Sequence, residues 1–368
     1  MSGDRIPFID LRPGEDDAAV RAAIDRVIAR GWFVLGPEVE AFEAEFASAS
    51  GAAHAVGVGT GTDAIALMLR AMNVNRGDEV IVPALTAAYT ALAVLLAGAT
   101  PVFADIDPER LTLDPDACEA AVTSRTVAIV PVHLYGQPAD MRALQSIAQR
   151  RSLAMIEDCC QAHLATCDDI PVGTRGAGGA FSFYPTKNLA AFGDGGAILT
   201  NDASLAERLR RLRNGGQIDR YVHLEAGDNS RLDDLQAAVL RARLPLLSGW
   251  TSRRRSLAAA YRRALPDNVR PLREHDTGHV YHLFVVRSPD RDALQAHLRA
   301  SGVDTLIHYP VPLPSQPAFA SIARGDCPVA ARTAREILSL PLHPRLTDAD
   351  VARVSAAIGA FQKGRILA

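Results

Sequence analysis

Short apolar runs alternate with longer amphipathic runs over the first half of the chain. The short runs are rich in β-branched residues and lie at Ala55–Val58, Glu79–Val82, Pro101–Ala104, Thr126–Val132, Leu153–Glu157, Ala180–Tyr184 and Gly196–Thr200. Helical spacing of apolar positions separates the earlier ones, at Asp63–Met72, Thr86–Ala97 and Ala139–Arg150. Because strands that alternate with helices build βαβ units, the pattern predicts an α/β domain with a mainly parallel sheet.

The pattern becomes mostly helical after about residue 203. The predicted elements are helices at Ser204–Arg213 and Leu232–Leu244, an Arg-rich segment at Ser252–Ala264, a strand at His282–Val286, and helices at Arg291–Ala300 and Asp348–Phe361. We therefore predict a large domain at residues 1–247 and a smaller C-terminal α+β domain at residues 248–368, with the boundary near Pro245–Trp250. A chain of 368 residues is long enough for two such domains.

Composition and charge argue against several classes of partner. The net charge is −3, so no strongly basic or acidic surface is expected, and nucleic acid and membranes are poor candidates. The N-terminus shows no signal peptide, and the most apolar run, Ala87–Ala97, is shorter than the roughly 20 residues that span a bilayer. Five cysteines without a repeated metal spacing predict reduced thiols in a cytoplasmic protein and no metal site.

Lysine is almost absent from the chain. Of 39 basic residues, only Lys187 and Lys363 are lysines, and the others are arginines. Arginine cannot replace a lysine whose neutral amine must attack a carbonyl, because the guanidinium stays protonated. Lys363 is expected on the surface near the C-terminus. Lys187 follows a predicted strand and precedes a glycine turn at residues 193–196, where desolvation would lower its pKa and permit a Schiff base; a surface lysine on a loop is the alternative.

A glycine-rich stretch, Gly57-Val-Gly-Thr-Gly-Thr-Asp63, follows one predicted strand and opens a helix. Small residues let a ligand approach the backbone, and the free N–H groups of a helix start favour an anion. A dinucleotide site would want glycine where Thr62 stands and an acidic residue ending the next strand, but Asp78 and Glu79 precede that strand. The stretch favours a phosphate cradle, with a plain structural turn as the alternative.

A second motif, Glu157-Asp158-Cys-Cys-Gln161-Ala-His163, lies at the end of another predicted strand. Ligands bind beyond the carboxyl ends of parallel strands, so Asp158 is expected to face such a crevice. A carboxylate there could keep a pyridine nitrogen protonated, and Gln161 could hydrogen-bond a phenolic oxygen. Capping of a following helix is the alternative role for Asp158.

Together these motifs resemble the DegT/StrS-type sugar aminotransferases over nearly the whole chain, from Ile6 to about Phe361. The resemblance rests on Gly61-Thr62-Asp63, Pro101-Val-Phe-Ala-Asp105, Pro131-Val-His-Leu-Tyr-Gly136, Glu157-Asp158, Ser182-Phe-Tyr-Pro-Thr-Lys187-Asn-Leu, Gly193-Asp-Gly-Gly, Asn229-Ser-Arg-Leu-Asp233 and His308-Tyr-Pro. It implies the fold of type I aspartate aminotransferases, pyridoxal 5′-phosphate (PLP) as cofactor, and amino transfer from L-glutamate or L-glutamine to a nucleotide-linked keto-deoxysugar.

The resemblance also implies residue roles. Lys187 would form the Schiff base and shuttle protons on the way to a pyridoxamine intermediate, Asp158 would pair with the pyridine nitrogen, and Gln161 would bind the ring hydroxyl. The phosphate would be held by Gly61, Thr62 and Ser182, and by Asn229 from the neighbouring subunit of a homodimer with shared active sites.

Two departures from the family pattern affect the expected site. The family usually carries a ring-stacking aromatic residue directly after Thr86, where this chain has Ala87, with Tyr89 two places later. Pro314 stands where relatives often carry histidine. Tyr89 is the predicted cofactor contact, with a different stacking residue and an ordinary core position for Tyr89 as the alternatives. The predicted substrate contacts are His163, His308 and Tyr309.

Several functional alternatives stay open within this resemblance. Lys187 argues against a dehydratase branch, which has histidine at the Schiff-base position. An aminotransferase acting on a cyclitol ketone and a non-catalytic PLP-binding regulator are the alternatives. The sequence does not determine the ketone position, the nucleotide, the stereochemistry, the choice between glutamate and glutamine, or the pathway.

Overall fold

The computed structural model describes residues 5–366, with side chains described to Phe361. A seven-stranded sheet has the order β1-β9-β8-β5-β4-β2-β3. Its strands are β1 (His54–Val58), β2 (Glu79–Pro83), β3 (Thr100–Ala104), β4 (Thr126–Ile129), β5 (Ala154–Asp158), β8 (Gly178–Ser182) and β9 (Gly196–Thr200). Every neighbouring pair is parallel except the two that include β9, which runs antiparallel to both β1 and β8. The predicted mainly parallel α/β fold is confirmed.

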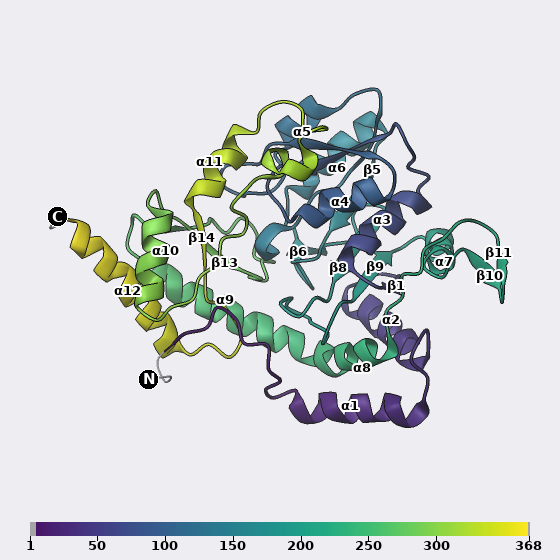
Figure 1. Cartoon of the computed structure of the whole chain (residues 1–368), viewed down its shortest axis with the longest axis horizontal. Coiled ribbons are helices and arrows are strands. Elements are labelled where there is room, and N and C mark those ends of the chain that lie inside the picture. Colours follow the sequence, from purple (N-terminus) through teal and green to yellow (C-terminus); the bar gives the residue numbers. More distant parts are fainter. Residues whose placement is uncertain (1–4, 367–368) are drawn as a thin grey trace.

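Helices cover both faces of this sheet (Figure 1). Side chains of α3 (Gly61–Ala71), α4 (Ala88–Leu96) and α7 (Ala203–Leu212) share one apolar cluster, and those of α2 (Pro37–Ala49), α5 (Pro115–Ala121) and α6 (Met141–Arg151) share another. Strand residues alternate between the two clusters: Val80 and Val82 belong to the first and Ile81 to the second. This period of two is the reason why the strands read as continuous apolar runs.

The C-terminal part begins where the short 3₁₀ turn η2 (Leu244–Leu246) joins α8 (Asp234–Arg243) to α9 (Leu247–Ala264). Its antiparallel sheet contains β12 (Arg270–Pro271), β13 (Phe284–Arg287) and β14 (Ile337–Leu340), and its helices include α10 (Arg291–Ala300), α11 (Pro328–Glu336) and α12 (Asp348–Ile366). A third apolar cluster joins α9, α10, α12 and β13 and also takes in Ile6 from the N-terminal segment. The division into domains at residue 247 stays a prediction.

Two N-terminal helices, α1 (Asp17–Arg30) and α2, were not predicted from the sequence. Figure 1 shows α1 running alongside α8. The buried carboxylate of Asp234, at the start of α8, accepts hydrogen bonds from the backbone N–H groups of Gly36 and Glu38 at 2.7 and 3.0 Å. It thereby supplies the cap that α2 lacks in its own sequence, since the residue before α2 is Gly36.

Shorter elements complete the chain: η1 (Leu134–Gly136), η3 (Leu313–Ser315), η4 (Pro317–Phe319), and the hairpins β6 (Thr166–Cys167) with β7 (Ile170–Pro171) and β10 (Gln217–Asp219) with β11 (Val222–His223). All five cysteines are free thiols. Among the described residues, none of the helices combines the length and the apolar character that crossing a bilayer requires.

Asp105, one of the family-motif residues, has a structural role. Its carboxylate accepts hydrogen bonds at 2.8 Å from the N–H groups of Val329 and Ala330, in the first turn of α11. We expect Asp105→Ala to lower the free energy of unfolding by about 1–2 kcal/mol, as loss of a helix cap does. Urea denaturation measures this, with exposed Asp267→Ala as control, which should change stability by less than about 0.5 kcal/mol. Equal effects of the two substitutions would contradict the capping role.

Candidate active site

A cavity of about 700 Å³ lies at the carboxyl ends of β5 and β8, between the first turns of α3 and α4 and the segment at residues 308–316. Nine of the residues predicted for the site line it: Gly61, Thr62, Tyr89, Asp158, Gln161, Ser182, Lys187, His308 and Tyr309. His163 and Asn229 are not among the lining residues. The topology accounts for this convergence, because the parallel strands β5 and β8 end at the same edge of the sheet.

One end of the cavity is formed by the start of α3 and the end of β8. Helix α3 begins at Gly61, and Thr60 caps it through a hydrogen bond from the N–H of Asp63 to its Oγ1 at 3.0 Å. A Cβ on Gly61 would lie 2.7 Å from Cys160 Sγ and 2.8 Å from the Cβ of Ser182. Only glycine lets this helix start approach Ser182 so closely. The free N–H groups of the first turn and the Ser182 side chain form a cradle suited to a phosphate.

This close approach leads to a prediction for Gly61→Ala. The added methyl group would push the helix start away from Ser182, so we expect phosphate-bearing ligands such as PLP to bind at least about tenfold more weakly, a loss of about 1.4 kcal/mol. Titration of the protein with PLP, followed by absorbance, measures the change. Gly249→Ala is the matched control, because a Cβ at Gly249 meets no atom within 4 Å. Equal PLP affinity in the two variants would contradict the cradle.

Asp158 occupies the last position of β5 and is almost fully buried. Its Oδ2 accepts a hydrogen bond from Thr90 Oγ1 at 2.8 Å, and its Oδ1 accepts one from the N–H of Cys160 at 3.1 Å. No helix directly follows β5 in the described chain, so helix capping does not explain this carboxylate. Thr90 was not predicted. In the sequence, only its position near the start of the predicted helix Thr86–Ala97 could have pointed to it. In the structure it lies in the first turn of α4 and lines the cavity.

Glu157, the residue directly before Asp158, stabilises the fold. Glu157 is fully buried and faces away from the cavity lining, where its carboxylate pairs with His133 Nε2 at 3.0 Å and accepts the N–H of Arg175 at 2.8 Å. The N–H of His133 in turn donates to the carbonyl of Asp158 at 3.0 Å. Glu157 and His133 therefore fix the backbone on which Asp158 stands.

Gln161 is held by two hydrogen bonds that orient its amide. Its Oε1 accepts from the N–H of Tyr135 at 2.8 Å, and its Nε2 donates to Tyr309 Oη at 3.1 Å. One N–H of Nε2 is left for a ligand. The burial of Tyr309 raises the pKa of its hydroxyl, so this group stays protonated and can donate a hydrogen bond.

Lys187 lies on the loop that connects β8 to β9. Ser182 pairs with Gly196 across these two strands, and the N–H of Lys187 donates to the carbonyl of Tyr184 at 2.8 Å. The side chain lines the cavity, where burial lowers the pKa of the amine while Cys160 and Asp158 partly oppose that shift. A surface lysine does not fit this position, and the arrangement favours a neutral, nucleophilic amine.

The remaining predicted residues differ in placement. His308 lines the cavity, and its Nδ1 is hydrogen-bonded to Ser339 Oγ at 2.9 Å. Burial and the charge of Lys187 lower the pKa of His308 to about 4. His163 is completely buried, and its Nε2 bonds to the carbonyl of Ser182 at 2.8 Å. His163 thus supports Ser182 from below the cavity, and its predicted contact with substrate gains no support from this position.

Asn229 and Tyr89 both face outward. Asn229 is exposed, next to Ser230, whose Oγ donates to Asp63 at 2.7 Å and so ties this segment to the start of α3. Tyr89 lines the mouth of the cavity with 64% of its surface exposed, and Ala87 lines the cavity as well. These positions leave the ring-stacking role of Tyr89 a prediction.

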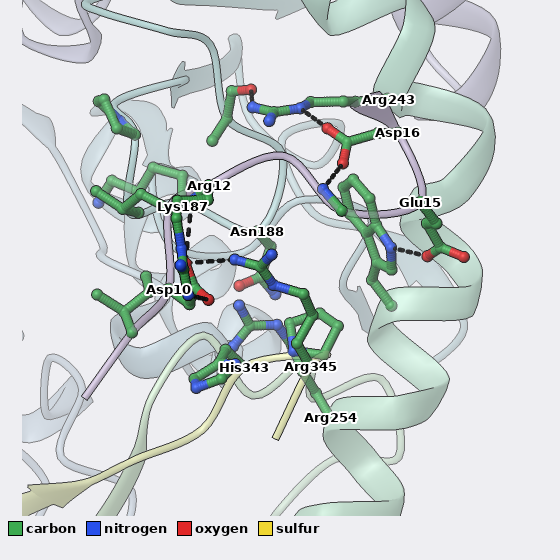
Figure 2. A pocket seen from close by; sticks show the side chains of 17 residues that line it. Asp10, Arg12, Glu15, Asp16, Lys187, Asn188, Arg243, Arg254, His343 and Arg345 are labelled. Carbon is green, nitrogen blue, oxygen red and sulfur yellow. Dashed lines mark hydrogen bonds and ion pairs between the residues drawn. The ribbon is translucent and has the colours of Figure 1, made fainter. Parts of the chain in front are cut away.

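A second cavity, of about 380 Å³, borders the same lysine loop (Figure 2). Figure 2 shows Lys187 and Asn188 facing arginine side chains from α9 and from the segment after β14, opposite the N-terminal segment. Ion pairs bind that segment in place, from Asp16 to Arg243 at 2.7 Å and from Asp10 to Arg345 at 2.5 Å. This cavity was not predicted, because its acidic and basic groups lie more than 200 residues apart in sequence.

Comparisons with known proteins agree on one family. The profile of the DegT/DnrJ/EryC1/StrS aminotransferase family matches residues 15–359. A dTDP-3-amino-3,4,6-trideoxy-alpha-D-glucose transaminase from Streptomyces venezuelae is 49% identical over 361 residues, covering 96% of this chain and 95% of its own. A UDP-N-acetyl-3-dehydro-alpha-D-glucosamine 3-aminotransferase from Acidithiobacillus ferrooxidans is 45% identical, covering 96% and 97%. The crystal structure of S. venezuelae DesV with a ketimine intermediate superposes with a TM-score of 0.95 at 48% identity, covering 98% and 99%.

Proposed function

The chain belongs to the DegT/DnrJ/EryC1/StrS aminotransferase family, and we propose that it uses PLP to move an amino group from L-glutamate or L-glutamine to a ketone of a nucleotide-linked deoxysugar. The observation that carries the proposal is Lys187, a half-buried residue whose amine has a lowered pKa, in one cavity with the Asp158 carboxylate. Relatives named as transaminases of dTDP- and UDP-linked sugars support the acceptor class.

The residues of the cavity fit PLP chemically. The Gly61 cradle matches a phosphate, because a side chain there would collide with Ser182. The Asp158 carboxylate is held by Thr90 and Cys160 and suits a protonated pyridine nitrogen, and one free N–H of Gln161 suits the ring hydroxyl. The cofactor, when bound, supplies an electron sink that makes the proton on the adjacent carbon removable.

The chain's own groups would then carry out binding and proton transfer. Lys187 Nζ, whose pKa burial lowers, would be the covalent attachment point for the cofactor and, once the donor has released it, would move a proton between the donor's α-carbon and the cofactor. Asp158 holds the ring nitrogen in its protonated state throughout. His308 and Tyr309 line the cavity together with Lys187 and with residues of the 310–316 segment, which supports their role as contacts of the sugar.

We further propose that the protein works as a cytoplasmic homodimer whose active sites are shared. Large apolar side chains are exposed after α1, on the lysine loop and on the β10–β11 hairpin, with Trp32 at 55%, Tyr184 at 52% and Tyr221 at 79% exposure. Such surfaces favour a protein partner. Asn229 is exposed as well and would reach the cofactor phosphate of the neighbouring subunit. The five free thiols support a reducing compartment.

The test is the visible absorption spectrum of the protein with PLP, before and after addition of L-glutamate or L-glutamine. We expect a yellow band that one of the two donors bleaches. The bleached protein is then given nucleotide-linked 3-keto and 4-keto deoxysugars, and mass spectrometry detects the amino sugar while the yellow band returns. A yellow band that both donors leave unchanged would overturn aminotransfer, and return of the band with cyclitol ketones alone would overturn the sugar acceptor.

A further inference from the structure

His282 lines the same cavity as Lys187, and no motif in the sequence predicts this position. It lies just before β13, about a hundred residues after Lys187, and only 7% of its surface is exposed. A buried imidazole in a reactive cavity needs an account of both ring nitrogens.

Asn188 determines which nitrogen of His282 carries the proton. Asn188 Nδ2 donates to the carbonyl of Val280 at 3.0 Å, and since a carbonyl can only accept, this bond fixes the orientation of the amide. Asn188 Oδ1 then faces His282 Nδ1 at 3.4 Å. Because Oδ1 can only accept, Nδ1 must carry the hydrogen, and Nε2 keeps its lone pair. Among the hydrogen bonds between described residues, the one that involves the His282 ring uses Nδ1.

Arg254 holds the backbone that carries this imidazole. Its Nη1 donates to the carbonyls of Tyr281, His282 and Leu342 at 3.2, 3.3 and 2.9 Å. Figure 2 shows Arg254 and Asn188 in the second cavity, next to Lys187. Asn188, which orients the His282 ring, directly follows Lys187 in the chain. The positions of the His282 and Lys187 side chains therefore depend on each other.

The charges around the pair keep His282 neutral. Burial lowers the pKa of His282 well below its usual value, and the charge of Lys187 is the next largest cause, followed by Arg254, His308 and His163. Asp158 and Cys160 act on Lys187 in the opposite direction. The carboxylate oxygens of Asp158 accept from Thr90 and Cys160, and the exposed carboxylate of Asp194 also lines the cavity.

We propose that His282 is a positioning residue for Lys187, and that its Nε2 accepts a hydrogen bond from the Lys187 amine whenever that amine is not bound to cofactor. The bond orients Nζ toward the reacting carbon, and because an ammonium group donates the stronger hydrogen bond, it also offsets part of the pKa lowering that burial causes. The inference rests on the proposed function for its purpose, but its test uses the protein without cofactor.

The two-lysine composition gives a direct readout. The cofactor-free protein is labelled with trace acetic anhydride between pH 6 and 11, and mass spectrometry of the two lysine peptides yields the apparent pKa of Lys187, with Lys363 as internal reference. Loss of a hydrogen bond to an ammonium group predicts that His282→Leu lowers the Lys187 pKa by about one. His282→Gln, whose side-chain oxygen can accept, should restore it. His297→Leu, a histidine on α10 outside the cavity, is the matched control and should have no effect.

The kinetic counterpart separates positioning from substrate binding. In the holoenzyme, His282→Leu should lower kcat at least about tenfold with little change in KM, because it affects a step after binding. An unchanged Lys187 pKa in His282→Leu, or a pKa that His282→Gln lowers equally, would overturn the inference. Should the leucine variant fail to fold, Asn188→Ala, which removes the group that orients the imidazole, should lower the pKa in the same direction, and no change there would overturn it too. If the Lys187 pKa shifts as expected but the protein shows no aminotransfer activity, the proposed function is rejected and the positioning role of His282 is kept.

Discussion

Replacing Lys187 with alanine is expected to lower the transamination rate by at least about 10⁴-fold, the upper range for loss of a general acid–base group. That factor corresponds to about 5.4 kcal/mol of transition-state stabilisation. Among the described residues, Lys187 is the only amine that lines the cavity, and no neighbouring side chain can take both its covalent and its proton-transfer roles. Steady-state assays and the loss of the yellow absorbance band on PLP addition measure the two roles separately.

Two controls make this result specific. Lys363→Ala removes the other lysine of the chain and should leave the rate unchanged. Lys187→Arg keeps a positive charge of similar length but cannot supply a neutral amine, so it should be as inactive as the alanine variant. The fold should persist in both Lys187 variants, as circular dichroism can verify, because the residue lies on a loop. Measurable activity in Lys187→Arg would contradict the neutral-amine mechanism.

Asp158→Asn is expected to lower the rate by about 10²–10³-fold, comparable to the loss of one electrostatic stabiliser in other enzymes. The asparagine has nearly the same shape, so Lys187 should still capture the cofactor and the yellow band should remain. Without a negative charge opposite the ring nitrogen, removal of the α-proton should become slow. Single-turnover decay of the band with glutamate measures this step directly.

Thr90→Val gives a graded comparison with Asp158→Asn. It leaves the carboxylate in place and removes only the hydrogen bond of 2.8 Å to Oδ2. One such bond to a charged group contributes about 1.5–3 kcal/mol, so a loss of roughly 10–100-fold is expected. A decay rate in Asp158→Asn equal to that of the unchanged protein would remove the assigned role of Asp158 and, with it, the reason for the Thr90 effect.

The sequence predicted the strands that carry the site because their burial on both faces leaves an uninterrupted apolar signal. Gly196–Thr200 and Glu79–Val82 agree with the structure to within a residue, whereas the run predicted at Ala180–Tyr184 is a strand at Gly178–Ser182. The chain leaves the sheet earlier there, since Phe183 already begins the lysine loop. The direction of β9 could not be read from its residues, because parallel and antiparallel strands buried on both faces show the same pattern.

Helices α1 and α2 and the residues around Lys187 escaped prediction for a different reason. The cap of α2 is Asp234, almost two hundred residues away, so no local motif marks that helix. Likewise, Thr90 and His282 acquire their roles only through partners in other elements, Asp158 and Asn188. Motifs with local spacing could be predicted from the sequence, whereas contacts between distant segments required the folded chain.

Ala87 and Tyr89 occupy positions at the cavity that the family resemblance helps to interpret. The resemblance marked Ala87 as a departure, and the structure places Ala87 in the cavity with Tyr89 at its mouth. Ala87 thus presents a methyl group to the cavity at the position where the resemblance leads us to expect an aromatic side chain. This difference could not be judged from spacing alone.

The antiparallel strand β9 also determines how far Lys187 can move. Since Ser182 pairs directly with Gly196, the loop of residues 183–195 leaves and re-enters the sheet at one point and forms a closed ring. The entropic cost of closing such a ring is met by strand pairing within the large sheet and grows only slowly with ring size. Insertions in this ring should consequently be tolerated on its outer side.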